Sequence, residues 1–206
     1  MTHGLPFPGW YTFNMFGFPD EALSIFAIVG WLLYFPTNHI IIHGHRFFHD
    51  TAFDAKIPII PWFVIPYVGL LPYALVCMYV VWSSPYKMEF LLSIAIAAWS
   101  AGVTWYFFPA GKMRKRRVGL DFFSHMISWI YRHDAGNDKF PSSHVFYAIL
   151  FSFYFSLALP AWTPLFITIG CFIAISTVLV KQHRVIDIFG GVVWAIAAIM
   201  IARIIM

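Results

Sequence analysis

Long apolar stretches separated by short polar segments dominate this chain of 206 residues. A helix that crosses the ~30 Å apolar core of a bilayer needs about 20 residues, and six stretches approach that length. The pattern therefore predicts an all-α, polytopic membrane bundle of about six transmembrane helices, over residues 21–42, 61–82, 90–109, 144–159, 164–180 and 188–206. Pro36, Asn38 and His39 interrupt the first stretch, and the fourth is short.

The segment from residue 110 to residue 140 is the one long connection between these stretches. Apolar residues recur in it at helical spacing, namely Leu120, Phe123, Met126, Ile127 and Ile130. Polar residues take the opposite face, namely Asp121, Ser124, His125, Ser128 and Arg132. This pattern predicts an amphipathic helix that lies in the membrane interface over the mouth of the bundle.

The composition supports a membrane protein with a single domain over residues 1–206. Hydrophobic residues make up 61% of the chain and charged residues 11%, with a mean hydropathy of +0.76, whereas soluble domains carry about 25% charged residues. The net charge is +4 and the pI is about 9.1, but the basic residues lie between apolar stretches. We therefore expect membrane lipids and a phosphate, and no nucleic acid, as partners.

If all six helices cross the membrane, every Lys and Arg except Lys87 and Arg203 falls on the same side. The positive-inside rule would place that side in the cytoplasm. Several of these charges are candidates for catalysis, so the side of the active site stays open. The same reasoning places His144 and His183 at one membrane face, because an even number of crossings separates them.

These two histidines are the candidates for chemistry at the membrane surface. His183 precedes Asp187 by four residues, so a helical turn would let the carboxylate hold the imidazole for attack on phosphorus. Ser142 and Ser143 open a helix whose free N–H groups would bind an anion beside His144. His144 could then protonate the leaving oxygen. Taken alone, the pair of His183 and Asp187 could almost as well be a helix cap beside an interfacial histidine, and residues 141–144 alone would be interpreted as an ordinary cap.

Five cations stand between Lys112 and Arg117, directly after the third apolar stretch. Such a run is most often a solvated anchor of membrane topology. Here it falls on the face of the two histidines, so we expect one or two of its members to reach a phosphate, for which Arg is better suited than Lys.

The order of these elements resembles the type 2 phosphatidic acid phosphatase superfamily of membrane phosphatases and phosphotransferases. Its second motif is Pro-Ser-Gly-His, and residues 141–144 read Pro-Ser-Ser-His. Its third motif is Ser-Arg, five residues, His, three residues, Asp; here Ser176-Thr177 precedes His183 and Asp187 at that spacing. Thr177 thus replaces the arginine of the motif, and Lys181 is the residue that would substitute for it.

The first motif, Lys, six residues, Arg-Pro, is not met in this chain, and its position is inferred. Three segments are similar to the branch of the superfamily that includes the inositol phosphorylceramide synthases, namely residues 57–62, Phe108-Pro109 and 134–142. The part of the chain that carries these motifs spans roughly residues 108–191.

The resemblance implies double displacement through a phosphohistidine, without a metal or a cofactor. It implies His183 as the nucleophile, Asp187 as its partner and His144 as the general acid. The expected phosphate-binding residues are Arg114, which is the first choice, and Lys112, Ser142, Ser143 and Lys181. The candidate headgroup contacts are Asn137, Asp134 and His43.

A second cluster leaves other functions open. It consists of His39, His43, His45 and His49 with Asp50 and Asp54. Pairs of histidines four residues apart can chelate a metal, which would suit a membrane di-iron oxidoreductase, but such enzymes need further ligand clusters that this chain lacks. We favour interfacial histidines, with headgroup recognition as a further alternative.

A transporter is the non-enzymatic alternative, although the ionisable residues concentrate at one face and do not follow a path across the membrane. The sequence therefore predicts a lipid-phosphate phosphatase, with a lipid phosphotransferase as the alternative. It distinguishes neither the lipid nor the acceptor, nor the oligomeric state.

Overall fold

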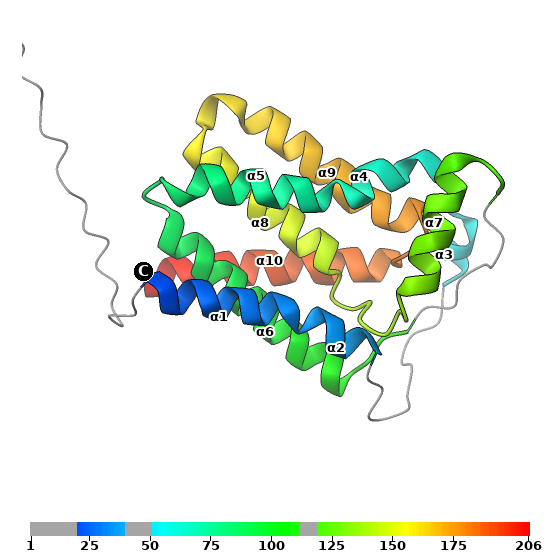
Figure 1. Cartoon of the computed structure of the whole chain (residues 1–206), viewed down its shortest axis with the longest axis horizontal. Coiled ribbons are helices and arrows are strands. Elements are labelled where there is room, and N and C mark those ends of the chain that lie inside the picture. Colours follow the sequence, from blue (N-terminus) through cyan, green and yellow to red (C-terminus); the bar gives the residue numbers. More distant parts are fainter. Residues whose placement is uncertain (1–19, 40–50, 112–118) are drawn as a thin grey trace, which may run out of the picture.

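The computed structural model describes residues 20–39, 51–111 and 119–206. In these ranges the chain is all-α (Figure 1), and no strand is assigned. The α-helices are α1 (Asp20–Leu32), α2 (Tyr34–His39), α3 (Ala52–Lys56), α4 (Val64–Val68), α5 (Leu70–Trp82), α6 (Lys87–Phe107), α7 (Phe122–His133), α8 (Ser143–Ala158), α9 (Thr163–Leu179) and α10 (Val185–Ile205). Short 3-10 turns precede α4 and α9, at Pro61–Phe63 and Pro160–Trp162.

Within the described ranges, four helical segments are long and apolar enough to cross a membrane, namely Pro61–Trp82, Lys87–Phe107, Pro160–Leu179 and Val185–Ile205. They correspond to the second, third, fifth and sixth predicted spans, whose apolar, helical nature is thereby confirmed. The last of them begins at Val185 and not at residue 188, so Asp187 lies inside the first turn of α10.

The first and fourth predicted spans are not among these four segments. The first is divided into α1 and α2 at Leu33, and Pro36 lies in the first turn of α2. A proline is tolerated there because the N–H groups of a first turn have no partner within the helix. The fourth span is α8, which has 16 residues and is therefore about 24 Å long at 1.5 Å per residue.

Helix α8 is the centre of the bundle and packs against α5, α6, α9 and α10 (Figure 1). Aromatic side chains on α8 fill much of the core, among them Phe146, Phe151, Tyr154 and Phe155. On α6, a small residue lets the junction between α1 and α2 approach closely: a Cβ on Gly102 would stand 2.8 Å from Leu33 Cδ1. Helix packing within membranes depends on such close approach of small residues.

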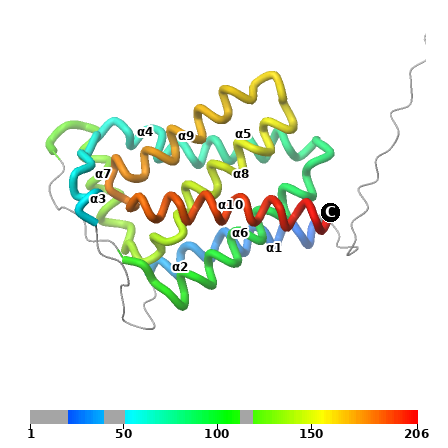
Figure 2. The backbone as a smooth tube through the Cα atoms, turned by 180° about the vertical axis from the view of Figure 1, so that it is seen from behind, coloured from blue at the N-terminus to red at the C-terminus, as the bar shows by residue number. Residues whose placement is uncertain are grey.

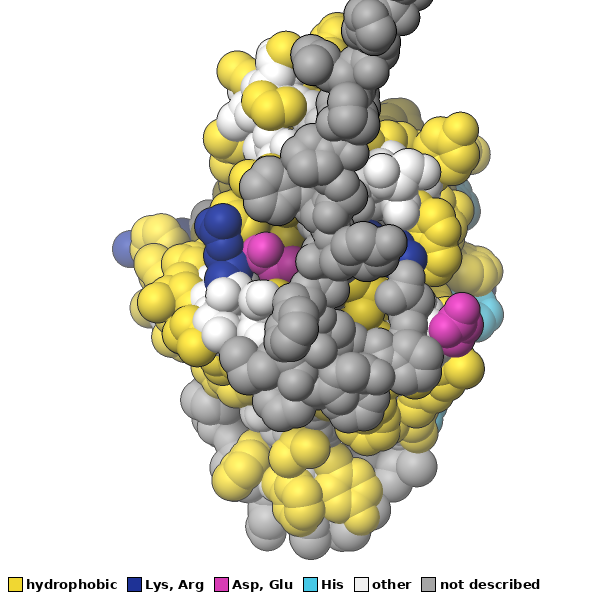
Figure 3. Space-filling view, turned by 90° about the vertical axis from the view of Figure 1, so that its left-hand side faces the viewer, with side chains coloured by type: hydrophobic (Ala, Val, Ile, Leu, Met, Phe, Trp, Pro, Cys, Tyr) yellow, Lys and Arg dark blue, Asp and Glu magenta, His cyan; other side chains and the backbone are white. Residues whose placement is uncertain are grey.

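The exterior of the bundle is apolar. Large hydrophobic side chains are exposed along the outer helices, as at Leu71 and Leu75 on α5, Phe172 on α9 and Val193 on α10. Figure 3 shows the end at which α10 finishes, where hydrophobic side chains make up most of the described surface and few charged ones lie among them. An exposed apolar surface on this scale is typical of a protein whose solvent is lipid.

The amphipathic helix forms as predicted, as α7, and packs across one end of the bundle. Its apolar face contacts Val64, Tyr67 and Val180, so that this face is turned toward the protein. Leu120, which was predicted to belong to the apolar face, is 92% exposed, because Asp121 caps the helix and leaves Leu120 outside it.

Helices α3 and α7 gather at the end of the bundle opposite the C-terminus, as both Figure 1 and Figure 2 show. The loop between α9 and α10 and the segment that leads into α8 lie at this same end. The candidate catalytic residues lie in these two connections or in the first turns of the helices that follow them, α8 and α10.

Candidate active site

His144 and His183 lie together at this end of the bundle. His144 is the second residue of α8, and His183 lies in the loop before α10. Their ring centroids are 6.2 Å apart, with an angle of 54° between the ring planes. The prediction that both histidines share one end of the bundle is therefore confirmed.

His183 is held firmly by its surroundings. The residue is 3% exposed, and its backbone N–H donates to the carbonyl of Thr177 at 3.0 Å. Its Nδ1 lies 3.0 Å from the carbonyl oxygen of Lys139 and 3.6 Å from Asp187 Oδ2. A carbonyl only accepts hydrogen bonds, so Nδ1 carries the proton and donates, which leaves the lone pair on Nε2.

The proximity of Asp187 to His183 has a different origin from the predicted helical turn. His183 precedes the helix, and Arg184 is the N-cap residue of α10. Asp187 Oδ2 accepts the backbone N–H of Arg184 at 2.8 Å. The carboxylate therefore caps α10, and the same cap brings it to the edge of the His183 ring.

The imidazole of His144 is stacked on an aromatic ring. Tyr67 of α4 lies parallel to it, with ring centroids 4.1 Å apart and an interplanar angle of 15°. His144 Nδ1 is buried and has no hydrogen-bond partner. Stacking fixes the plane of the ring and occupies neither of its nitrogen atoms.

Ser142 and Ser143 begin α8 as predicted. Ser142 is the N-cap residue, but its side chain makes no capping hydrogen bond, and its fully buried Oγ has no partner in the structure. The Ser142 hydroxyl, which makes no hydrogen bond, thus lies next to the N–H groups of the first turn of α8 and beside His144. Such a helix start is suited to an anion.

Two glycines of α10 allow this turn to approach the helix closely. A Cβ on Gly190 would overlap the Phe140 ring, and one on Gly191 would stand 2.9 Å from the carbonyl oxygen of Ser142. The backbone N–H of Ser142 also donates to the carbonyl of Asp187 at 3.2 Å. Missing side chains at 190 and 191 therefore bring the two histidine-bearing segments together.

Arg184 is a charged residue of the site that the sequence analysis did not single out. The residue is fully buried, and its Nε lies 3.4 Å from Asp187 Oδ2. In the sequence, its position directly after His183 indicates that it could belong to the site. The guanidinium group carries a fixed positive charge into the immediate surroundings of the candidate nucleophile.

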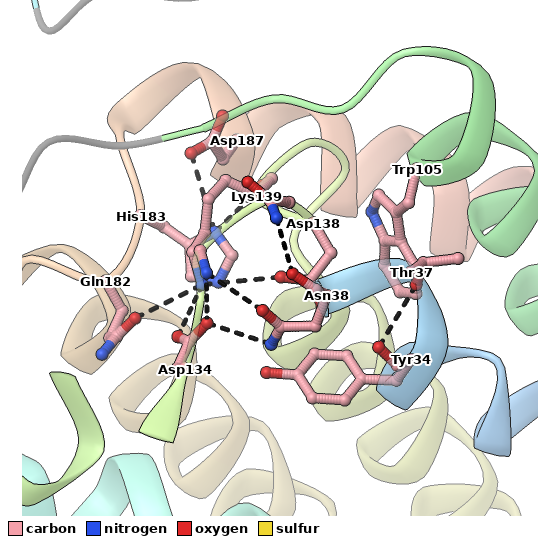
Figure 4. A network of polar contacts seen from close by, with 12 residues as sticks. Tyr34, Thr37, Asn38, Trp105, Asp134, Asp138, Lys139, Gln182, His183 and Asp187 are labelled. Atoms are coloured by element: carbon pink, nitrogen blue, oxygen red, sulfur yellow. Dashed lines mark hydrogen bonds and ion pairs between the residues drawn. The ribbon is translucent and has the colours of Figure 1, made fainter. Parts of the chain in front are cut away.

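A buried network of polar contacts surrounds Lys139 (Figure 4). Its ammonium group donates to Asp134 Oδ2 at 2.7 Å and to Gln182 Oε1 at 3.4 Å. Asp134 Oδ1 accepts from Asn38 Nδ2 at 3.0 Å, and Asn137 Nδ2 donates to the Asn38 carbonyl at 2.7 Å. Asp134 and Asn137, the described candidate headgroup contacts, thus join α2 to the segment before α8.

Asp138 is the anomalous carboxylate of this network. It is 1% exposed, neither carboxylate oxygen has a hydrogen-bond partner, and its contact with Lys139 Nζ is 3.6 Å long. Burial raises the pKa of Asp138 to about 6, against the opposing effect of the Lys139 charge, and the charge of Asp134 raises it further.

Lys181 has a positive φ of 55° and donates from Nζ to the carbonyl of Asp54 at 2.6 Å. Asp54, from α3, also accepts the backbone N–H of Val185 through Oδ1 at 2.9 Å. Asp54 therefore attaches α3 to both sides of the His183 loop, a role that the sequence did not reveal. The role of Lys181 at a phosphate stays a prediction.

The remaining predicted residues lie outside the described part of the chain. Lys112 and Arg114 fall within residues 112–118, and His43 falls within residues 40–50. Of the four histidines in the second cluster, His39 is described and lies exposed at the end of α2. Among the residues that the structure describes, no group of three or more His, Cys, Asp or Glu side chains is placed to hold a metal ion.

Comparison with known proteins identifies no relative of this chain. No protein-family model matches the chain, and neither a curated protein nor a solved structure matches it.

Proposed function

We propose that this chain is an integral, multi-pass membrane phosphatase that hydrolyses a lipid phosphate through a phosphohistidine intermediate. The observation that carries the proposal is the 6.2 Å separation of the His144 and His183 rings. An attacking nitrogen approaches phosphorus at about 3 Å, and a proton donor stands about 3 Å from the leaving oxygen. Two imidazoles at this separation can flank one phosphoryl group.

The surroundings of each ring suggest its role. His183 has its proton on Nδ1, so the Nε2 lone pair can attack phosphorus. His144, beside the helix start at Ser142, can protonate the departing alcohol and then take a proton from the water that cleaves the P–N bond. Hydrolysis returns His183 to its neutral form and releases phosphate, and no step requires a metal.

The location of the site supports a lipid as the substrate. The histidines lie at one end of a bundle whose described part contains four helices of membrane-spanning length and composition. A phosphate at this end would stand at the level of lipid headgroups, while an attached chain would extend along the apolar exterior. A phosphate monoester or diphosphate of a lipid fits both requirements.

The test is release of inorganic phosphate from a panel of lipid phosphates by the purified protein in EDTA. We expect turnover by the unaltered protein and none by His183→Gln or His144→Gln, with His125→Gln as the matched control. His125 is exposed on α7 and bonds to the carbonyl of its own helix cap, Asp121. Near-normal rates in His183→Gln would contradict the proposal.

The intermediate can be trapped directly. Brief incubation with a ³²P-labelled lipid phosphate followed by alkaline denaturation should leave label on His183, because phosphohistidine is stable to base. His144→Gln should accumulate this label if the substrate has a good leaving group, since hydrolysis is then the slow step. Added alcohols that divert label from phosphate into a new ester would identify a phosphotransferase.

A further inference from the structure

His183 needs an orienting group, and two oxygen atoms compete for its Nδ1. We infer that the main-chain carbonyl of Lys139 is the group that sets the tautomer of His183, and that the Lys139 side chain is a positioning residue that holds this carbonyl in place. The catalytic meaning of the inference rests on the proposed function, whereas the orientation of the ring does not.

The distances favour the carbonyl over the carboxylate. The Lys139 oxygen lies 3.0 Å from His183 Nδ1, within the normal range of an N–H···O hydrogen bond. Asp187 Oδ2 lies 3.6 Å away, which is beyond that range. The same Oδ2 already accepts the backbone N–H of Arg184 at 2.8 Å.

Lys139 is bound at three points, which explains why its carbonyl is held so firmly. Its backbone N–H donates to the Ala110 carbonyl at 3.2 Å. Its ammonium group, on a residue that is 2% exposed, contacts Asp134 Oδ2 at 2.7 Å. The third point is Gln182 Oε1 at 3.4 Å, and Gln182 is the neighbour of His183 in the chain.

One residue thus contacts the His183 loop twice, through its carbonyl on the ring and through its ammonium group on Gln182 (Figure 4). A shift of the loop would break both contacts together. The buried ion pair with Asp134 then acts as an anchor for the whole segment. Removing the ammonium group should loosen the carbonyl without removing it.

The two acceptors would contribute differently to catalysis. A neutral carbonyl fixes the proton on Nδ1 but attracts an imidazolium only weakly, whereas a nearby carboxylate stabilises positive charge on the ring. The carbonyl therefore determines the tautomer, and Asp187 determines how readily the ring becomes charged. Replacement of Asp187 by Asn should leave the proton on Nδ1.

The experiment measures the tautomer by ¹⁵N NMR of histidine-labelled protein in detergent, with the His183 signal assigned by its loss in His183→Gln. We expect Nδ1–H in the unaltered protein and in Asp187→Asn. Lys139→Met should give a mixture of tautomers, Lys139→Arg should restore Nδ1–H, and the exposed Lys56 provides the control Lys56→Met. Removal of a group that does not touch the substrate but orients a functional histidine lowers activity by about 10- to 100-fold. The kcat of Lys139→Met should therefore fall by that factor, while its KM changes little.

If Lys139→Met does not fold because Asp134 is left unpaired, the double variant Lys139→Met/Asp134→Asn removes both charges and should give the same mixture of tautomers. Nε2–H in the unaltered protein would overturn the inference. So would a change of tautomer in Asp187→Asn with none in the Lys139 variants. Absence of phosphate release from the unaltered protein would refute the proposed function alone, because the NMR measurement needs no turnover.

Discussion

Asp138 should make the stability of this protein fall as the pH rises from about 4 to about 7. Its pKa is about 6 in the folded protein, against an ordinary value of 3.8, chiefly because of burial. One unit of pKa corresponds to about 1.36 kcal/mol, so the folded state disfavours the ionised carboxylate by about 3 kcal/mol.

The sign follows from proton linkage. Well below pH 4 the carboxyl group is neutral in the folded and unfolded states, so Asp138 does not lower the free energy of unfolding. Between about pH 4 and pH 6 the carboxyl group ionises in the unfolded chain but stays largely protonated in the folded chain, so the unfolded state gains stability over this window. The cost of about 3 kcal/mol is complete above pH 7, and Asp138→Asn, which stays neutral, should remove it.

The assay is unfolding by SDS in mixed micelles, followed by tryptophan fluorescence, at pH values from 4 to 8. The free energy of unfolding of Asp138→Asn relative to the unaltered protein should rise by about 3 kcal/mol over this range. Asp121→Asn is the control, because hydrogen bonds from the side chain and backbone of Ser124 hold the pKa of Asp121 below its ordinary value of 3.8. The contribution of Asp121 to stability therefore changes only below about pH 4, so the difference between Asp121→Asn and the unaltered protein should stay nearly constant over this range. A difference between Asp138→Asn and the unaltered protein that does not vary with pH would refute the reasoning.

Two further predictions concern how the site is held together, and both are measured by the same unfolding assay. Gly191→Ala should destabilise the protein by about 1–3 kcal/mol, because the new Cβ would stand 2.7 Å from Val145 Cβ. The control is Gly69→Ala, whose new Cβ would have its nearest contact at 3.1 Å and which should lose less stability. Equal losses of stability in the two variants would contradict the packing argument. Asp54→Ala should lower the free energy of unfolding by about 1–2 kcal/mol, because the Val185 N–H loses its acceptor. Asp54→Asn keeps an acceptor and should retain most of the stability. Equal losses of stability in the two variants would show that the acceptor does not matter.

Hydropathy predicted the helices well because burial in lipid acts on each segment separately. A run of apolar residues needs no distant partner to become a helix in a bilayer, since the helix satisfies its own backbone groups. The ends of the helices were less predictable. α10 begins at Val185 because Asp54 and Asp187 cap it, and the first of these caps comes from a residue 131 positions away.

The pairing of His144 with His183 followed from counting crossings, which depends only on the number of helices between them. Their supporting residues did not follow from any such rule. From the sequence alone, Lys139 is indistinguishable from an ordinary loop lysine. Arg184 is likewise indistinguishable from the other cations of a basic membrane face. The contact between Lys139 and Gln182 joins residues 43 positions apart, and their burial depends on how the two connections pack.

The charges at the described site nearly cancel, which bears on where a phosphate would find its counter-charge. The ammonium group of Lys139 is 2.7 Å from Asp134, and the guanidinium group of Arg184 is 3.4 Å from Asp187. These buried pairs shape the site but contribute little net positive potential, because each cation lies against a carboxylate. A phosphate dianion therefore needs further cations, and the basic run between residues 112 and 117 is where we expect them. This requirement is independent of the motif resemblance that first pointed to Arg114.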